Sequence, residues 1–315
     1  MSRTIVVGAA QLGPIARAED RGSVVARMIA LLDKAAQRGC TLVVYPELAL
    51  TTFFPRWFMP DQGEVDAFFE TAMPNPATAP LFARARDLGV AISFGYAEKI
   101  VENGRLRRFN TSILTDASGE IVHRYRKIHL PGHSENEPWR AFQHLEKRYF
   151  EPGEEPFAPV DALGGKIGMA ICNDRRWPET YREHALRGTE MVLIGYNTPV
   201  HYPLAPEHDH LQCFHNHLSL QAGAYQNGMW VVGVAKAGRE ENCDLIGQSC
   251  IVAPTGEIVA QASTLGDELV THDCDLDRCT EIRANIFDFA KHRRPEMYPL
   301  LSAPVSPVVP AHDPA

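Results

Sequence analysis

The feature that most constrains this chain is the alternation of short apolar runs with segments of helical periodicity. Strands are expected at Thr4–Gln11, 41–45 and 90–96, and helices between them at 23–37 and 80–88. The run at 41–45 is apolar over almost its whole length, which is typical of a strand covered on both faces. Strands and helices alternating in this way predict a layered α/β fold.

The second half of the chain shows the same alternation. Strands are expected at 166–171, 191–195 and 229–235, with helices at 179–187 and 208–225. A β-hairpin is expected in each half, and in both the turn leads into the sequence Gly-Glu-Ile-Val, at 119–122 and at 256–259. The repeat suggests a duplicated plan, a βαβ unit followed by a hairpin.

Composition and charge argue against several classes of protein. The formal net charge is −8 with no long basic run, so nucleic acid is not an expected partner. The apolar runs are too short to cross a bilayer, and the N-terminus lacks the features of a signal peptide. Seven scattered cysteines without a Cys-x-x-Cys pair favour free thiols and a cytoplasmic location. We expect one domain at 1–302 and a Pro-rich tail at 303–315.

Three reactive side chains stand where expected strands end. Glu47 follows Leu-Val-Val-Tyr-Pro, Lys127 follows Ile-Val-His-Arg-Tyr-Arg, and Cys172 follows Ile-Gly-Met-Ala-Ile. Sites in layered α/β proteins form at the carboxyl ends of strands, so these three groups are expected to converge in one pocket.

The context of Cys172 predicts a nucleophile. A tight turn from strand to helix would lift its thiol out of the sheet and leave backbone N–H groups facing a developing oxyanion. Lys127 could stabilise the thiolate and the oxyanion, while Glu47 could accept the thiol proton and pass it to a leaving amine. Alone, Cys172 would be read as a small buried residue and Lys127 as a solvated strand end.

Three segments together resemble the signature blocks of the nitrilase superfamily. They are Val-Tyr-Pro-Glu47-Leu, Tyr-Arg-Lys127-Ile-His-Leu and Ile-Cys172-Asn-Asp-Arg-Arg-Trp-Pro-Glu, and their central residues are 80 (127 − 47) and 45 (172 − 127) positions apart. Within the superfamily, the segments 48–57, 129–133, 142–150 and 195–199 are similar to N-carbamoyl-D-amino acid hydrolases.

The resemblance implies a four-layer αββα sandwich and a Glu47–Lys127–Cys172 triad supported by Glu146. It implies hydrolysis of N-carbamoyl-D-amino acids to the D-amino acid, carbon dioxide and ammonia, through a covalent intermediate on Cys172. Neither a metal nor another cofactor is expected, and the chain is expected to form a homodimer or homotetramer.

Several polar residues are candidates for binding the substrate. Arg175 and Arg176 follow the nucleophile, and at least one, by preference Arg176, is expected to bind a carboxylate through a bidentate fork. Surface ion pairs with Asp174 or Glu179 are the alternative for these arginines. The other candidates are Asn173, Asn197, Thr198, His129 and His144. The Asn-Thr-Pro at 197–199 is equally typical of a turn.

Three other functions remain open on the sequence. Another superfamily hydrolase, such as an aliphatic amidase, a nitrilase or a β-ureido acid hydrolase, would use the same triad with a different pocket. A zinc amidohydrolase would need the histidines at 208, 210, 215 and 217, whose spacing matches no established metal site. A non-catalytic interaction protein is disfavoured because all three triad residues are present.

Overall fold

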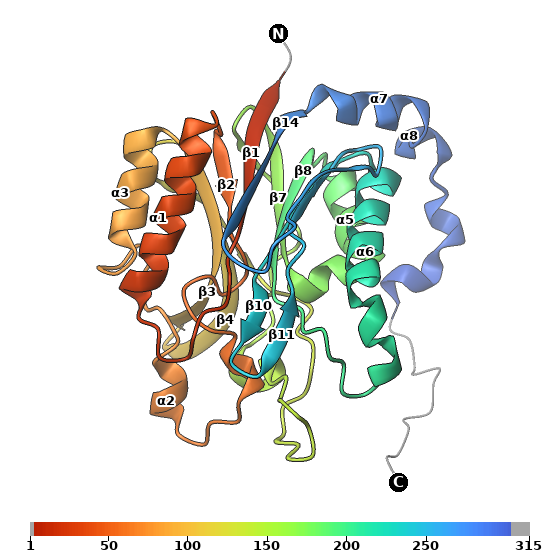
Figure 1. The fold of residues 1–315 in the computed structure, drawn as a ribbon. Helices are drawn as coiled ribbons and strands as arrows, with labels where there is room; N and C mark the ends of the chain where they lie inside the picture. Colours follow the sequence, from red (N-terminus) through yellow and green to blue (C-terminus); the bar gives the residue numbers. More distant parts are fainter. Residues whose placement is uncertain (1–2, 304–315) are drawn as a thin grey trace.

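The computed structural model describes residues 3–303 as two β-sheets packed face to face between two layers of helices (Figure 1). Helices α1 (Arg21–Gln37) and α3 (Ala79–Leu88) cover the first sheet, and α5 (Pro178–Leu186) and α6 (Gln212–Asn227) cover the second. The expected four-layer αββα sandwich is therefore confirmed. The tail expected at 303–315 lies, except for Ala303, outside the described residues.

The first sheet has six strands around a parallel centre. Strands β1, β2 and β3 are parallel, whereas β4, β5 and β14 pair antiparallel to their neighbours. In spatial order the strands are β14 (Glu268–Asp275), β1 (Thr4–Gln11), β2 (Leu42–Val44), β3 (Ala91–Glu102), β4 (Arg105–Thr115) and β5 (Ile121–Arg126).

The second sheet repeats this arrangement. Strands β7, β8 and β9 are parallel, and β12, β13 and β6 are antiparallel to their neighbours. In spatial order the strands are β13 (Ile258–Gln261), β12 (Cys250–Val252), β9 (Trp230–Ala235), β8 (Met191–Tyr196), β7 (Gly165–Ile171) and β6 (Val160–Ala162). The shared strand order supports the duplicated plan indicated by the two hairpins.

The remaining elements lie at the ends of the sandwich, except that the segment after α7 runs along the outside of α5 and α6 (Figure 1). They are α2 (Gln62–Asp66), α4 (Glu146–Tyr149), the β10 (Ala237–Glu240) and β11 (Cys243–Ile246) hairpin, α7 (Asp277–Asn285), α8 (Phe289–His292) and five 3-10 turns, η1 (Phe54–Arg56), η2 (Cys172–Arg176), η3 (Pro206–Leu211), η4 (Pro295–Met297) and η5 (Pro299–Ser302). The helix expected at 208–225 is thus wrong at its start, because Pro206–Leu211 forms a 3-10 turn before α6 begins.

The core lies between the sheets, and its composition explains the apolar strands. Every residue of β2 and β9 is buried, because each strand has the other sheet on one face and helices on the other. Strand β1 contacts β9, β3 contacts β8, and β4 contacts β7 across the interface. No helix within residues 3–303 is long and apolar enough to span a membrane.

Candidate active site

The expected nucleophile turn is present at the end of β7. Cys172 has a φ of 48°, in the left-handed region that non-glycine residues rarely adopt, and it begins the 3-10 turn η2. Its Sγ lies 3.6 Å from the carbonyl oxygen of Asn197, which follows β8. The sharp turn therefore directs the thiol out of the second sheet toward the carboxyl end of the neighbouring strand.

Glycines on both sheets make room for Glu47. A Cβ atom on Gly95 in β3 would lie 2.8 Å from the Cα of Glu47, and one on Gly195 in β8 would lie 2.4 Å from its backbone N. Real Cβ atoms do not approach that closely, so both positions require glycine. The backbone of Glu47 is thus held between the two sheets, and its side chain is fully buried.

Four hydrogen bonds orient the Glu47 carboxylate. Its Oε1 accepts from Lys127 Nζ at 2.8 Å and from Asn110 Nδ2 at 2.8 Å. Its Oε2 accepts from the backbone N of Asn197 at 3.0 Å and from Asn197 Nδ2 at 3.2 Å. Donors from both sheets therefore compensate the cost of burying this charge.

Lys127 is the centre of the cluster. Its buried ammonium also donates to Oε2 of Glu146 at 2.6 Å, and Glu146 Oε1 lies 3.2 Å from Nε2 of His144. Glu146 is buried at the start of α4, although the charged sequence around it is typical of a surface. Lys127 is therefore not a solvated strand end, and Glu146 is buried despite its charged neighbours in the sequence.

The charges of the cluster determine its resting protonation. Burial alone would lower the pKa of Lys127, but the negative charges that Cys172, Glu146 and Glu47 can carry raise it overall. Burial alone would raise the pKa of Glu146, but Lys127 and His144 lower it overall. For Cys172, burial and the charge of Glu47 outweigh Lys127 and Arg175 and raise the pKa to about 11. The resting site therefore holds an ammonium, an ionised Glu146 and a neutral thiol.

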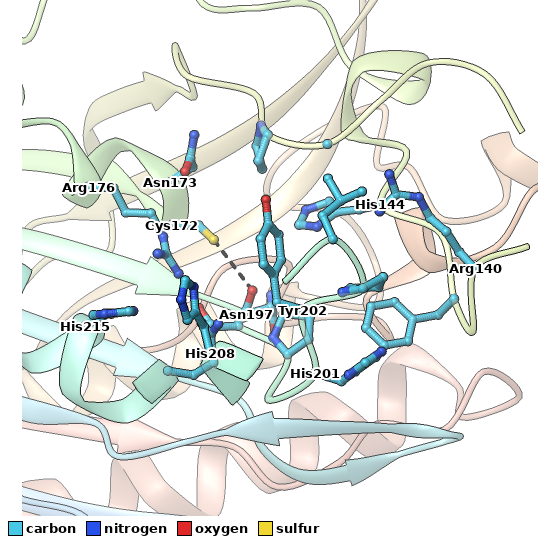
Figure 2. A pocket seen from close by; sticks show the side chains of 18 of the residues that line it. Arg140, His144, Cys172, Asn173, Arg176, Asn197, His201, Tyr202, His208 and His215 are labelled. Carbon is cyan, nitrogen blue, oxygen red and sulfur yellow. Dashed lines mark hydrogen bonds between the residues drawn. The ribbon is translucent and has the colours of Figure 1, made fainter. Parts of the chain in front are cut away.

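Cys172 opens into a cavity of about 620 Å³ (Figure 2). In Figure 2 the sulfur lies beside Arg176, and in this view the ring of Tyr202 lies between the sulfur and His144. The cavity is lined by two arginines, five histidines and no carboxylate among the described residues. This lining favours an anionic ligand over a cationic one.

The family comparison agrees with this geometry. The model of the carbon-nitrogen hydrolase family matches residues 6–284. The chain belongs to this family. The resemblance to the nitrilase superfamily is thereby confirmed.

Curated relatives of this carbon-nitrogen hydrolase cover most of its length. A nitrilase of Pyrococcus abyssi is 30% identical over 269 residues, which are 85% of this chain and 90% of the relative. An N-carbamoylputrescine amidase of Solanum lycopersicum is 29% identical over 317 residues, with 95% of each chain covered. The crystal structure of a carbon-nitrogen hydrolase from Helicobacter pylori has a TM-score of 0.80 at 24% identity, covering 94% of this chain and 97% of the other, and supports the fold.

The candidate substrate residues of this carbon-nitrogen hydrolase divide into two groups. Arg176, Asn173, Asn197, Thr198 and His144 line the cavity. Arg175 and His129 do not line it, and each is bonded within the protein. Arg175 donates to the carbonyl of Cys172 at 2.6 Å, to Asn216 at 2.9 Å and to the hydroxyl of Thr198 at 2.7 Å, and it stacks over Tyr196. His129 Nδ1 lies 2.8 Å from Asp174.

The histidines of the zinc hypothesis do not converge. His208 and His215 line the cavity with ring centroids 6.5 Å apart, whereas His210 and His217 are absent from its lining. No group of three or more His, Cys, Asp or Glu residues in the described part of this carbon-nitrogen hydrolase is placed to hold a metal ion.

Asn110 and Asp174 belong to the site but were not predicted from the sequence. Asn110 is fully buried within β4. Buried polar side chains are hydrogen-bonded, so a polar residue within a buried strand could have been predicted to have a partner in the site. Asp174 was considered only as a surface partner for the arginines. It is fully buried and bonds instead to Tyr125, Ile171 and His129.

Proposed function

We propose that this protein hydrolyses N-carbamoyl-D-amino acids to the D-amino acid, carbon dioxide and ammonia. The observation that carries the proposal is the guanidinium of Arg176, which lies in the cavity beside Cys172. Arg176 makes no hydrogen bond or ion pair with any residue of the range 3–303, and its neighbour Arg175 is committed to internal contacts.

An unpaired arginine in a cavity without carboxylates is best explained by an anionic ligand. Arg176 is exposed to the cavity, so it stays cationic at neutral pH even though desolvation and the nearby charge of Arg175 lower its pKa to about 10. A substrate carboxylate could bind this unpaired guanidinium through a bidentate ion pair. An amino acid supplies such a carboxylate next to the nitrogen that carries the carbamoyl group.

The carbamoyl part of the proposal rests on other support. The relative from Solanum lycopersicum is named for an N-carbamoyl substrate, and the cluster of Glu47, Lys127 and Cys172 is suited to attack on a carbonyl flanked by nitrogen. The preference for the D isomer is supported by the similarity of segments 48–57, 129–133, 142–150 and 195–199 to N-carbamoyl-D-amino acid hydrolases.

In the first half of the reaction, the neutral thiol of Cys172 attacks the ureido carbonyl and its proton passes to Glu47. The raised thiol pKa means that the proton leaves as the sulfur–carbon bond forms, rather than beforehand. The ammonium of Lys127 stabilises the negative charge on the tetrahedral oxygen. Glu47 then protonates the leaving nitrogen as its bond to carbon breaks.

In the second half, water attacks the carbonyl carbon of the enzyme-bound group and Glu47 accepts its proton. The carbon–sulfur bond breaks, and the thiol of Cys172 regains the proton. The released carbamic acid breaks down to carbon dioxide and the remaining amine. Glu146 bonds to Lys127 at 2.6 Å and holds the ammonium in place throughout.

A second candidate is another hydrolase of the superfamily, an amidase or nitrilase whose substrate has no carboxylate. The 30% identity to the nitrilase of Pyrococcus abyssi favours it. The two candidates predict different roles for Arg176, because only the substrate of the first carries a carboxylate that Arg176 could bind.

Ammonia release from a matched set of substrates tests the proposal. The purified protein is offered the carbamoyl derivatives of a D-amino acid, of its L isomer and of the corresponding amine without the carboxylate. We expect the D-amino acid derivative to be turned over fastest. Equal kcat/KM for the carbamoyl amine would support the second candidate, and a preference for the L isomer would contradict the stereochemical assignment.

A further inference from the structure

Asp174 is a buried carboxylate to which the proposed mechanism gives no role. It lies in η2, two residues after Cys172, and its side chain is fully buried. It makes no contact with the substrate cavity. A buried charge without a catalytic role is costly unless its bonds do something else for the site.

The bonds of Asp174 are distributed around the two reactive residues. Its Oδ2 accepts from the hydroxyl of Tyr125 at 2.7 Å and from the backbone N of Ile171 at 2.9 Å. Its Oδ1 accepts from the backbone N of His129 at 2.9 Å and lies 2.8 Å from Nδ1 of the same residue. Tyr125 and His129 stand two positions before and after Lys127, and Ile171 directly precedes Cys172.

These bonds cross from one sheet to the other. Tyr125 belongs to β5 of the first sheet, and Ile171 ends β7 of the second. Burial and the charge of Asp174 raise the pKa of Tyr125 well above its usual value, so the phenol keeps its proton and donates. Asn173 adds a parallel bond from its Nδ2 to the carbonyl of His129 at 3.1 Å.

We propose that Asp174 is a positioning residue that fixes the ammonium of Lys127 relative to the thiol of Cys172. One carboxylate binds the backbone just before the nucleophile and the chain on both sides of the lysine. Displacement of either reactive group would therefore stretch at least one bond to Asp174. The inference rests on the proposed function only in taking Lys127 and Cys172 as the reacting pair.

The test is Asp174→Asn, which keeps the shape but removes the charge and turns one acceptor into a donor. Two quantities are measured: kcat and KM, and the rate at which iodoacetamide alkylates Cys172 at neutral pH, followed by mass spectrometry of the Cys172 peptide. The alkylation needs no substrate, so it stays informative even if the substrate assignment fails. Asp116→Asn is the matched control, because Asp116 also accepts several bonds but on the remote hairpin turn before β5.

We expect kcat to fall by about 10- to 100-fold, since small displacements of reacting groups have effects of this size. KM should stay within about threefold, because Arg176 and the cavity are untouched. Alkylation of Cys172 should slow, since Lys127 no longer stabilises charge on the sulfur, and Asp116→Asn should change neither quantity. Unchanged kcat, or alkylation as fast as in the wild type, would overturn the proposal.

Tyr125→Phe covers the case in which Asp174→Asn does not fold. This variant removes a single donor without changing the charge, and the ring can keep its stacking on Phe157. We expect the same pattern at smaller amplitude, with slower alkylation and lower kcat at an unchanged KM. If folded Tyr125→Phe matches the wild type in both, the proposal fails.

Discussion

Arg175 and Arg176 are adjacent in the chain but lie in opposite environments. Arg175 is buried and bonds to the carbonyl of Cys172, whereas Arg176 projects into the cavity without a protein partner among residues 3–303. The 3-10 turn that begins at Cys172 separates the two side chains in this way. Arg175 therefore stabilises the structure of the site, whereas Arg176 is free to bind a ligand.

Arg176→Lys should impair hydrolysis of carbamoyl amino acids nearly as much as Arg176→Gln, because lysine keeps the charge but loses the bidentate fork. We expect a loss of about 2–5 kcal/mol in transition-state stabilisation, or about 30- to 5,000-fold in kcat/KM. The measurement is kcat/KM on the carbamoyl amino acid and on the carbamoyl amine.

The loss should be confined to the substrate that carries the carboxylate. Arg175→Lys is the contrasting variant: it should affect both substrates alike and also lower the melting temperature, since Arg175 holds Asn216, Thr198 and the carbonyl of Cys172. Equal losses on both substrates in Arg176→Lys would rule out recognition of the acid by this residue.

Cys172→Ala should abolish turnover and leave the fold intact, because the substitution is small and removes only the nucleophile. Residual activity above about a thousandth of the wild-type rate would sink the covalent mechanism. Cys172→Ser should also be inactive, because Glu47 is too weak a base for a hydroxyl. Circular dichroism and melting temperature provide the check on folding.

Stability should fall in mild acid because of His184. Burial lowers the pKa of His184 from 6.5 to about 4, although its bond to the carbonyl of Met169 acts in the opposite direction. A base with a lowered pKa binds fewer protons when folded, so its contribution is complete above pH 6.5 and is lost as the pH falls toward 4. The free energy of unfolding should drop by about 3 kcal/mol across this window.

Urea unfolding at a series of pH values measures this effect. His184→Gln is neutral at every pH and should show a shallower dependence than the wild type, whereas His292→Gln, at an exposed position, should follow the wild type. Parallel pH profiles for the wild type and His184→Gln would contradict the assignment.

Gly195→Ala should displace Glu47, because the new Cβ would lie 2.4 Å from the backbone N of that residue and 2.7 Å from the carbonyl carbon of Pro46. Backbone atoms cannot move aside as a flexible side chain can, so we expect about 1–3 kcal/mol of destabilisation and about a 100-fold loss of kcat. Gly266→Ala is the control, since its Cβ would meet nothing within 4 Å. Wild-type kcat in Gly195→Ala would show that this close approach does not position the base.

Periodicity predicted the alternation of strands and helices, because the central strands are buried on both faces and read as apolar runs, whereas the four-layer arrangement was implied by the resemblance to the nitrilase superfamily. It missed β14, most of whose residues are only partly buried and whose partner β1 is distant in the chain, and the short β10–β11 hairpin, in which each strand carries one exposed residue. Glu47, Lys127 and Cys172 could be predicted from the sequence, since each follows an apolar strand whose end is recognisable from the neighbouring residues. Asn110 and Asp174 could not be found in this way, because their roles depend on bonds between segments far apart in the sequence.

The division of the site between the sheets has a consequence for the newly made chain. Glu47 and Lys127 follow strands of the first sheet, and Cys172 and Asn197 follow strands of the second. A ribosome therefore adds the proposed base Glu47 and the proposed oxyanion partner Lys127 before it adds the proposed nucleophile Cys172. Until the second sheet docks, the Glu47 carboxylate lacks both bonds from Asn197, so catalytic competence should appear only late in folding, together with the closed sandwich.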